Sequence, residues 1–149
     1  MTLRDITPYI EEDADVTLAN LNLINGCASE SLGHPIFTEL KVFGGAIYNE
    51  GQLNITGSTL SNNLAQADTI EGESGLGGAI YNVSGTITIN DSTINDNIAD
   101  IGGGIFTGLA LPGDITLTET TVSHNQSTAS GGGILMFTGN LIITDSTFT

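Results

Sequence analysis

The acidic side chains of two short stretches are the groups in this sequence best suited to bind a metal ion. Residues 65–76 carry Asp68, Glu71 and Glu73 close together, and Ca²⁺ takes several oxygen ligands of this kind at about 2.3–2.6 Å. A second stretch, 28–43, adds further acids. We expect the two stretches to be neighbouring loops, which makes the three carboxylates a candidate calcium site; two solvated acidic loops are the alternative. The residues of the second stretch expected nearby are Glu30, His34, Glu39 and Lys41.

Three further carboxylates, Asp91, Glu119 and Asp145, recur at equivalent places of the repeat described below. Like charges about 5 Å apart repel unless a cation, a proton or solvent separates them. This column could hold a metal or, as we favour, consist of turn residues that face water. Glycoside hydrolysis needs two carboxyl groups about 5–10 Å apart. Asp91 paired with Asp96 or Glu119 could satisfy that distance, so a carbohydrate-active hydrolase is kept as the alternative function.

The remaining reactive side chains are few and isolated. His34 and His124 have no serine or cysteine nucleophile nearby in the sequence, and Cys27 is the only cysteine. A single cysteine excludes an intrachain disulfide and a Cys/His metal cluster. We expect Cys27 to be a small buried residue of the core. No residue is therefore assigned a catalytic or cofactor-binding role.

The charge balance limits the partners that this chain can bind. Lys and Arg number 2 against 17 Asp and Glu, for a formal net charge of −15, which repels nucleic-acid backbones and anionic membranes. No apolar run approaches the roughly 18 residues needed to span a bilayer, and Met1–Ile10 does not have the pattern of an export signal. We expect no nucleic-acid partner and no membrane insertion by this segment.

An internal repeat sets the elements that would position these groups. The motif Gly-Gly-(Ala/Gly)-Ile, followed by a large apolar residue, recurs at intervals of 25–33 residues. Such intervals are too short for a propeller blade, and no paired helices accompany them, so they indicate a β-solenoid with three short strands in each turn. The copies are Gly44–Tyr48, Gly77–Tyr81, Gly102–Phe106 and Gly131–Leu135.

Two stretches with alternating apolar residues follow each motif, as expected for strands that bury one face. A degenerate copy at 16–26 precedes the first motif, which gives about five coils. Stacking the coils forms three aliphatic columns and places the paired glycines at corners that need positive φ or close approach. Asn63, Asn97 and Asn125 form another column, which we expect to be a ladder of side-chain amides. The aliphatic columns are Ile47, Ile80, Ile105 and Ile134; Ile55, Ile89, Leu117 and Ile143; and Leu60, Ile94, Val122 and Phe148.

These motifs resemble those of a known family. The Gly-Gly-Ala-Ile motif, with apolar-x-x-Asn in place of Phe-x-x-Asn at Leu60–Asn63, Ile94–Asn97 and Val122–Asn125, is similar to the repeats of chlamydial polymorphic outer-membrane proteins. Similar repeats occur in secreted bacterial proteins of the pectate-lyase-like β-helix superfamily. The resemblance covers about 16–149 and implies an all-β, right-handed parallel β-helix that is displayed on a surface and binds host or neighbouring cells. The chain departs from the family in using Leu, Ile or Val where Phe is usual, and it contains no translocating barrel.

Two activities of other β-solenoids fit this chain less well. Lyases of the superfamily generally use an Arg or Lys base, whereas Arg4 and Lys41 are far apart. A stripe of Tyr48, Tyr81 and Phe106 could stack on a sugar ring or pack beneath a loop. Outward threonines could order water as in an ice-binding solenoid, which ranks third because the rows are interrupted. The rows are Thr17, Thr88 and Thr116, and Thr56, Thr118 and Thr144, interrupted by Asn54, Asn90 and Ile142.

The sequence therefore predicts one three-sided β-helix segment over residues 1–149, excised from a longer protein, with long corner loops at about 28–43 and 65–76. We expect a non-enzymatic segment for adhesion or scaffolding, stabilised by Ca²⁺, in a secreted or cell-surface bacterial protein. The expected partner is a cell-surface protein or glycan. Strand edges left open at Thr149 would favour end-to-end self-association.

Overall fold

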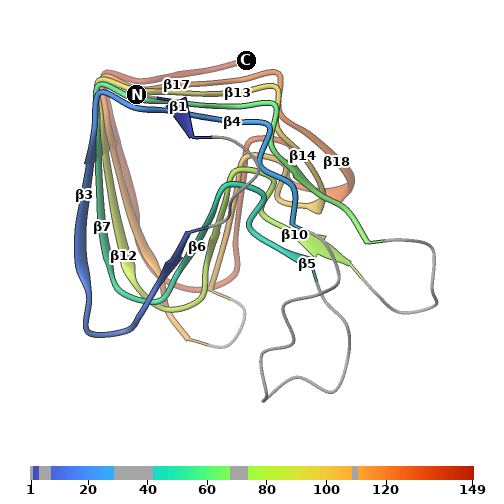
Figure 1. Cartoon of the computed structure of the whole chain (residues 1–149), viewed down its shortest axis with the longest axis horizontal. Helices are drawn as coiled ribbons and strands as arrows, with labels where there is room; N and C mark the ends of the chain where they lie inside the picture. Colours follow the sequence, from blue (N-terminus) through green and yellow to red (C-terminus); the bar gives the residue numbers. More distant parts are fainter. Residues whose placement is uncertain (1, 4–7, 29–41, 68–73, 109–110) are drawn as a thin grey trace.

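The structure is a stack of coils built from parallel strands. The computed structural model describes residues 2–3, 8–28, 42–67, 74–108 and 111–149. The chain winds repeatedly around one outline, so that the strands of successive coils lie behind one another (Figure 1). Every pairing between the described strands is parallel, and the strands form four sheets of about five coils. The predicted all-β parallel solenoid is confirmed.

We label the four sheets A to D. Each sheet takes strands from successive coils, and within a coil the chain passes through sheets B, C, A and D in that order. Sheet B contains β2 (Tyr9–Ile10), β6 (Ile47–Asn49), β11 (Ile80–Asn82), β15 (Ile105–Thr107) and β19 (Ile134–Met136). Sheet C contains β3 (Asp15–Ala19), β7 (Gln52–Thr56), β12 (Thr86–Asn90), β16 (Asp114–Thr118) and β20 (Leu141–Thr144). Sheet A contains β1 (Thr2–Leu3), β4 (Asn22–Ile24), β8 (Thr59–Ser61), β13 (Thr93–Asn95), β17 (Thr121–Ser123) and β21 (Thr147–Phe148). Sheet D contains β5 (Val42–Phe43), β10 (Gly75–Leu76), β14 (Ile98–Ile101) and β18 (Gln126–Ser130), with β9 (Leu64–Ala65) paired to β14.

Sheet D is where the structure differs from the predicted three-sided outline. Sheets B, C and A are the three predicted sides, and sheet D is a fourth ladder in the region expected to be only corner loops. Its strands β9 and β10 have two residues each and are separated by an insertion. Strands this short show no alternating apolar pattern, so the repeat could not reveal them.

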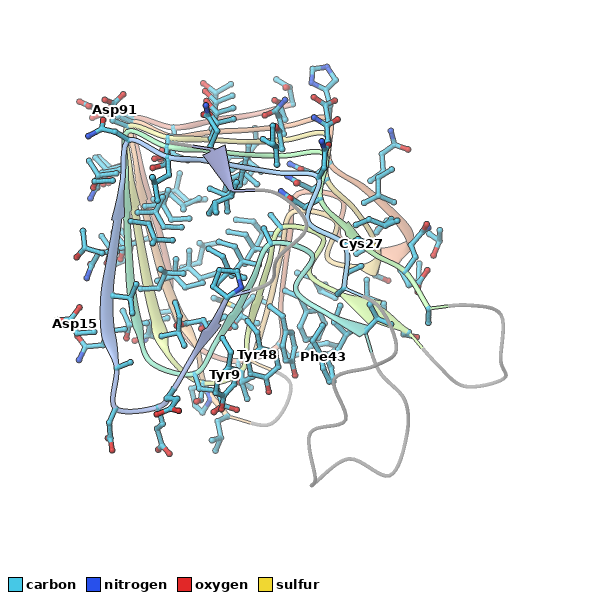
Figure 2. All side chains as sticks on the ribbon, viewed as in Figure 1. Tyr9, Asp15, Cys27, Phe43, Tyr48 and Asp91 are labelled. Atoms are coloured by element: carbon cyan, nitrogen blue, oxygen red, sulfur yellow. The ribbon has the colours of Figure 1, made fainter. Side chains whose placement is uncertain are left out.

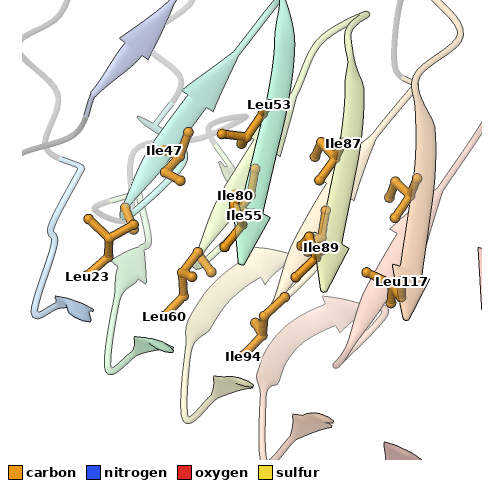
Figure 3. Packing of buried hydrophobic residues seen from close by; sticks show 14 of the residues in the cluster. Leu23, Ile47, Leu53, Ile55, Leu60, Ile80, Ile87, Ile89, Ile94 and Leu117 are labelled. Atoms are coloured by element: carbon orange, nitrogen blue, oxygen red, sulfur yellow. The ribbon is translucent and has the colours of Figure 1, made fainter. Parts of the chain in front are cut away.

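The aliphatic columns fill the interior in the predicted register. Ile80 pairs with Ile47 and Ile105, Ile89 with Ile55 and Leu117, and Ile94 with Leu60 and Val122, as Figure 3 shows for most of them. The degenerate first copy also has the predicted alignment. Burial of these side chains is nearly complete, and such burial stabilises by about 1.5–3 kcal/mol per side chain. The columns are therefore the main source of stability. The leucines and isoleucines with an exposed fraction of 0% are Ile47, Ile55, Leu60, Ile80, Ile87, Ile89, Ile94, Ile105, Ile115 and Leu117.

The glycine corner between sheets D and B has the two properties expected of it. The first glycine of each pair adopts positive φ, for example +69° at Gly77. The second allows close approach of the coils: a Cβ on Gly78 would lie 2.1 Å from the carbonyl oxygen of Gly103 in the next coil. A side chain at either position would force the ladder apart.

Two other corners need positive φ, and there the chain uses mainly polar residues. The corner between sheets C and A and the corner between sheets A and D both have φ between 45° and 57°. Asn and Asp tolerate this left-handed conformation better than most residues. The first corner contains Asn20, Gly57, Asp91, Glu119 and Asp145, and the second contains Asn25, Asn62, Asp96 and His124.

Buried polar side chains also stack from coil to coil. The Asn63 amide donates to Asn97 Oδ1 at 2.8 Å, and the Asn97 amide donates to Asn125 Oδ1 at 2.9 Å, which confirms the predicted ladder. Each of the three amides also donates to a backbone carbonyl of a neighbouring coil. A second ladder, which the sequence analysis missed, joins Asn49 to Asn82 at 2.6 Å. These bonds satisfy polar groups that would otherwise be costly to bury.

Replacing a column residue by an acid tests the assigned register. In Ile94→Asp a charge enters a dry column without a partner, so we expect a loss of at least about 3 kcal/mol in the free energy of unfolding. Its neighbour Thr93 points outward, and Thr93→Asp should cost less than about 1 kcal/mol. Urea unfolding followed by circular dichroism measures both. Equal losses in the two variants would mean that the register is wrong.

Adding one methyl group at a glycine tests the corner. In Gly78→Ala the new Cβ meets backbone at 2.1 Å, so we expect a loss of about 2 kcal/mol or more. Gly133 is the matched control because its added Cβ would meet only side-chain carbons, at 3.4 Å or more, and Ala79 occupies the equivalent position. Gly133→Ala should leave the midpoint of thermal unfolding unchanged or raise it. A Gly78→Ala variant as stable as the parent would contradict the close approach.

Candidate functional site

The predicted metal ligands Asp68, Glu71 and Glu73 lie outside the described residues, as do the expected neighbours in 29–41. The calcium site therefore stays a prediction. Elsewhere in the described parts of the chain, no group of three or more His, Cys, Asp or Glu side chains could hold a metal ion. In the same parts, no helix is long and apolar enough to cross a bilayer.

The described ends of the two long loops do leave the same edge of the solenoid. The Ala28 amide donates to the Leu64 carbonyl at 3.0 Å at the start of the loops. Val42 pairs with Gly75, and Phe43 with Leu76, where the loops return. The described ends of the two insertions thus lie at one corner of consecutive coils.

Asp100 lies at the base of the second insertion and was not singled out from the sequence. Its Oδ2 accepts hydrogen bonds from the backbone amides of Ala67, at 3.0 Å, and Gly75, at 2.7 Å. Its Oδ1 accepts one from the Thr128 hydroxyl at 3.1 Å. One carboxylate therefore binds both described ends of the insertion and the following coil. No sequence motif marks this role, because the two amides are distant from Asp100 along the chain.

Aromatic rings form a continuous stack along the outside of sheet B. Tyr48 lies 5.3 Å from Tyr81, and Tyr81 lies 5.6 Å from Phe106, measured between ring centroids, so the predicted stripe exists. Tyr9 and Phe137 extend it at 5.1 and 5.8 Å. The rings of the middle coils are buried, with exposed fractions of 2% for Tyr81 and 1% for Phe106, and they pack with apolar residues of sheet D. The predicted stripe of Tyr48, Tyr81 and Phe106 thus belongs to a second apolar core between sheets B and D, and these three rings offer no open platform for a sugar ring.

Glu50 sits at one end of this stack, where it accepts two phenol hydrogen bonds. The Tyr9 hydroxyl donates to one carboxylate oxygen at 2.6 Å, and the Tyr48 hydroxyl donates to the other at 3.2 Å. Figure 2 shows Tyr9, Tyr48 and Phe43 close together, and the Tyr48 ring contacts both of the others. The hydrogen bond to Glu50, followed by burial, raises the pKa of Tyr9 to about 12. Burial, followed by the charge of Glu50, raises the pKa of Tyr81 to about 12 and that of Tyr48 further still.

The acidic column is on the outside of the molecule. Asp91, Glu119 and Asp145 are exposed, and Figure 2 shows Asp91 on the convex corner between sheets C and A. Substrate sites are concave because they must enclose the ligand and exclude water. The exposed, convex position of the column agrees with the expectation that it consists of turn residues that face water and not of metal ligands.

The candidate hydrolase pairs are poorly placed for catalysis. Asp91 and Asp96 lie at opposite ends of β13, five residues apart in extended chain, which corresponds to roughly 15 Å. That separation exceeds the range that glycoside hydrolases use. Asp91 and Glu119 stack at the distance of neighbouring coils, but both lie on the exposed convex corner. We find no support for the hydrolase alternative in these carboxylates.

Cys27 and the threonine rows are arranged differently from what the sequence suggested. Cys27 is exposed; in the ladder with Leu64 it takes the outward position, so the prediction of a buried residue was wrong.

The outward rows of sheet C are interrupted as expected, with Asn54 in register with Thr88. Sheet A instead carries four threonines in register, a run that ends at Asn22 in β4 and was overlooked because it belongs to the short second strand. This column is Thr59, Thr93, Thr121 and Thr147.

The tyrosine environment gives a prediction for alkaline pH. Because all 3 tyrosines have raised pKa values in the folded protein, none should ionise near the ordinary value of 10.0 until the chain unfolds. A pKa that is higher in the folded state contributes stability below pH 10 and loses it as the pH rises towards 12. Tyrosinate absorbance should therefore rise in step with unfolding, and denatured protein should titrate near 10. Titration of the tyrosines near pH 10 with native circular dichroism retained would contradict the buried stack.

Comparison with known proteins matches one coil of this architecture. Residues 57–83 match the model of the Chlamydia polymorphic membrane protein repeat. The matched residues run from Gly57 through β8, β9 and β10 to Val83 and include both the Leu60–Asn63 motif and Gly77–Ile80. No curated protein and no solved structure matches the chain. The chain thus carries a repeat of the type found in bacterial outer-membrane and cell-surface proteins, within a parallel β-solenoid.

Proposed function

We propose that this chain is a non-catalytic β-helix module of a bacterial surface protein, which serves adhesion or scaffolding and presents its two long loops as the contact surface. The observation that carries the proposal is the position of the insertions. Their described ends lie in neighbouring coils of sheet D, whereas the other described parts of each coil form aliphatic, amide and glycine ladders. Variation in a solenoid is tolerated at such corners, and they often form the binding face.

The match at 57–83 supports the cellular context of this proposal. It supports an outer-membrane or cell-surface location in a bacterium; an extracellular position of this particular segment is part of the proposal. The strongly acidic composition suits such a setting, because a net charge of −15 keeps a repetitive β-structure soluble. The partner that we propose is a protein or glycan of another cell surface.

Calcium binding by the second loop is the finer part of the proposal. The ligands would be Asp68, Glu71 and Glu73, whose carboxylates are the oxygen donors that Ca²⁺ prefers. The first loop would contribute further oxygen ligands. A bound ion would offset the repulsion between the charges of this loop.

The stacking surface at the end of the solenoid offers a second kind of contact. Ile143 and Phe148 have exposed fractions of 46% and 43%, whereas Leu117 and Val122, with which they are in register, are almost fully buried. Another coil of the same type, from this or a second molecule, would cover these residues and the open strand edges. End-to-end association is thus part of the scaffolding proposal.

The first experiment measures thermal unfolding of the chelated protein with and without millimolar Ca²⁺. We expect Ca²⁺ to raise the melting temperature, because an ion that binds only the folded state stabilises it. The combined variant Asp68→Asn, Glu71→Gln and Glu73→Gln should lose this shift. The control removes the same number of charges from an exposed turn by Glu11→Gln, Glu12→Gln and Asp13→Asn, and it should keep the shift. Without a shift in the parent protein, the calcium part of the proposal fails.

Binding to immobilised bacterial or host-cell surface extracts tests the contact surface. We expect saturable binding without sugar release or other turnover. The structure supplies a loop-free control: Ala65 and Leu76 are in register with Ala99 and Ile101, so deleting 66–74 joins Ala65 to Gly75 and preserves the ladders, including the pairing of Gly75 with Val42. This variant should fold and lose binding. Unchanged binding by the loop-free variant would exclude the second loop as the contact surface.

A further inference from the structure

The coil that follows the second insertion runs across its base. Ile98 and Ala99 pair with Leu64 and Ala65, on one side of the insertion. Ile101 pairs with Leu76, on the other side. Residues 66–75 are therefore opposed by Asp100 alone. The side chain of Asp100 is placed where the insertion leaves the solenoid and returns.

An insertion at this point interrupts the ladder and leaves backbone amides that need new acceptors. A backbone N–H at a partly buried site is costly if it is left without a partner. The Ala67 and Gly75 amides, one from each end of the insertion, both donate to Asp100 Oδ2. Because one oxygen accepts both bonds, the two ends are held side by side. Hydrogen bonds to a charged acceptor are stronger than those between neutral groups.

The other carboxylate oxygen connects the same site to the next coil. Asp100 Oδ1 accepts from the Thr128 hydroxyl, which lies in β18 of sheet D. The ladder between β14 and β18 shifts register between Ala99 and Ile101, so Asp100 alone stands opposite Thr128 and Ala129, which form a bulge in β18. With Thr128 opposite it in this bulge, the Asp100 carboxylate accepts from the coils on both sides.

We propose that Asp100 is a positioning residue, a clasp that closes the base of insertion 66–75 and fixes the direction in which it leaves the solenoid. This role concerns the geometry of the solenoid itself. It does not depend on what the insertion binds. Its use in presenting a contact loop rests on the proposed function.

Two substitutions separate hydrogen bonding from bulk at this position. Asp100→Leu keeps a side chain of similar length and removes every acceptor. Asp100→Asn is the matched conservative variant: its amide oxygen can accept both backbone bonds, and its amide nitrogen can donate to the Thr128 hydroxyl. Asp114→Leu is the control. Asp114 lies in sheet C, away from the insertion, and its carboxylate accepts hydrogen bonds from Asn140 in the next coil.

Amide hydrogen exchange by nuclear magnetic resonance is the decisive measurement. In Asp100→Leu we expect the Ala67 and Gly75 amides to exchange at least tenfold faster. The Ile80 and Ile98 amides, which donate to Gly104 and Asn63, should be unchanged. Asp100→Asn should restore protection, and Asp114→Leu should leave both reporter amides as in the parent. If Asp100→Leu does not fold, Asp100→Ser, whose hydroxyl is too short to reach both amides, is measured in the same way.

Two results would overturn the clasp. Unchanged exchange at Ala67 and Gly75 in the acceptor-free variant would show that Asp100 does not hold them. Acceleration that is equal at Ile80 and Ile98 would show a general loss of stability instead of local opening. Surface binding, measured in parallel, reports on the function separately: a clasp confirmed by exchange in a protein that binds nothing leaves the positioning role intact and removes the adhesion proposal.

Discussion

The parallel hydrogen-bonded ladder between coils is the interaction on which the rest of this structure depends. Strands of neighbouring coils lie about 4.8 Å apart, so equivalent residues must stack directly on one another. Each position along the coil then has one chemical requirement that every copy has to meet. The Ile89 position must be aliphatic, the Asn97 position must both donate and accept, and the Asp91 position must tolerate positive φ. Self-similarity is for this reason a stronger guide to the fold than composition.

This dependence explains what could be predicted from the sequence and what could not. The aliphatic columns, the amide ladder and the glycine corners recur in most copies, and all three were predicted in the correct register. Sheet D could not be predicted, because β9 and β10 are short and separated by an insertion whose length differs from coil to coil. The outward position of Cys27 follows from the same ladder and was missed for the same reason. Asp100 became recognisable only when the structure brought Ala67 and Gly75 to one carboxylate.

Amide ladders stabilise the interior in a way that aliphatic columns cannot. An asparagine side chain has both donors and acceptors, so Asn97 accepts from Asn63, donates to Asn125 and donates to the Leu60 carbonyl. A column shifted by one coil position would leave these groups unpaired, which makes the ladder a determinant of register as well as of stability. Where the second ladder ends at Asn49, its Oδ1 has no partner among the described residues, and Ile10 occupies the next position in register. The cost of ending an amide ladder is therefore visible in the structure.

The acidity of the chain has more than one physical origin. At the corner between sheets C and A, left-handed conformation costs most residues about 1–2 kcal/mol, and Asp and Asn reduce that cost. Repulsion between two solvated charges about 5 Å apart is smaller, under about 1 kcal/mol, so the backbone requirement decides, and Asn20 and Gly57 fill the same corner as Asp91. The acidic column is thus explained without a bound cation. Asp100 is different: its carboxylate accepts three hydrogen bonds from groups of two neighbouring coils. The net charge does not distinguish carboxylates that suit a turn from a carboxylate that positions a loop. The hydrogen bonds and backbone conformation of each acid make that distinction.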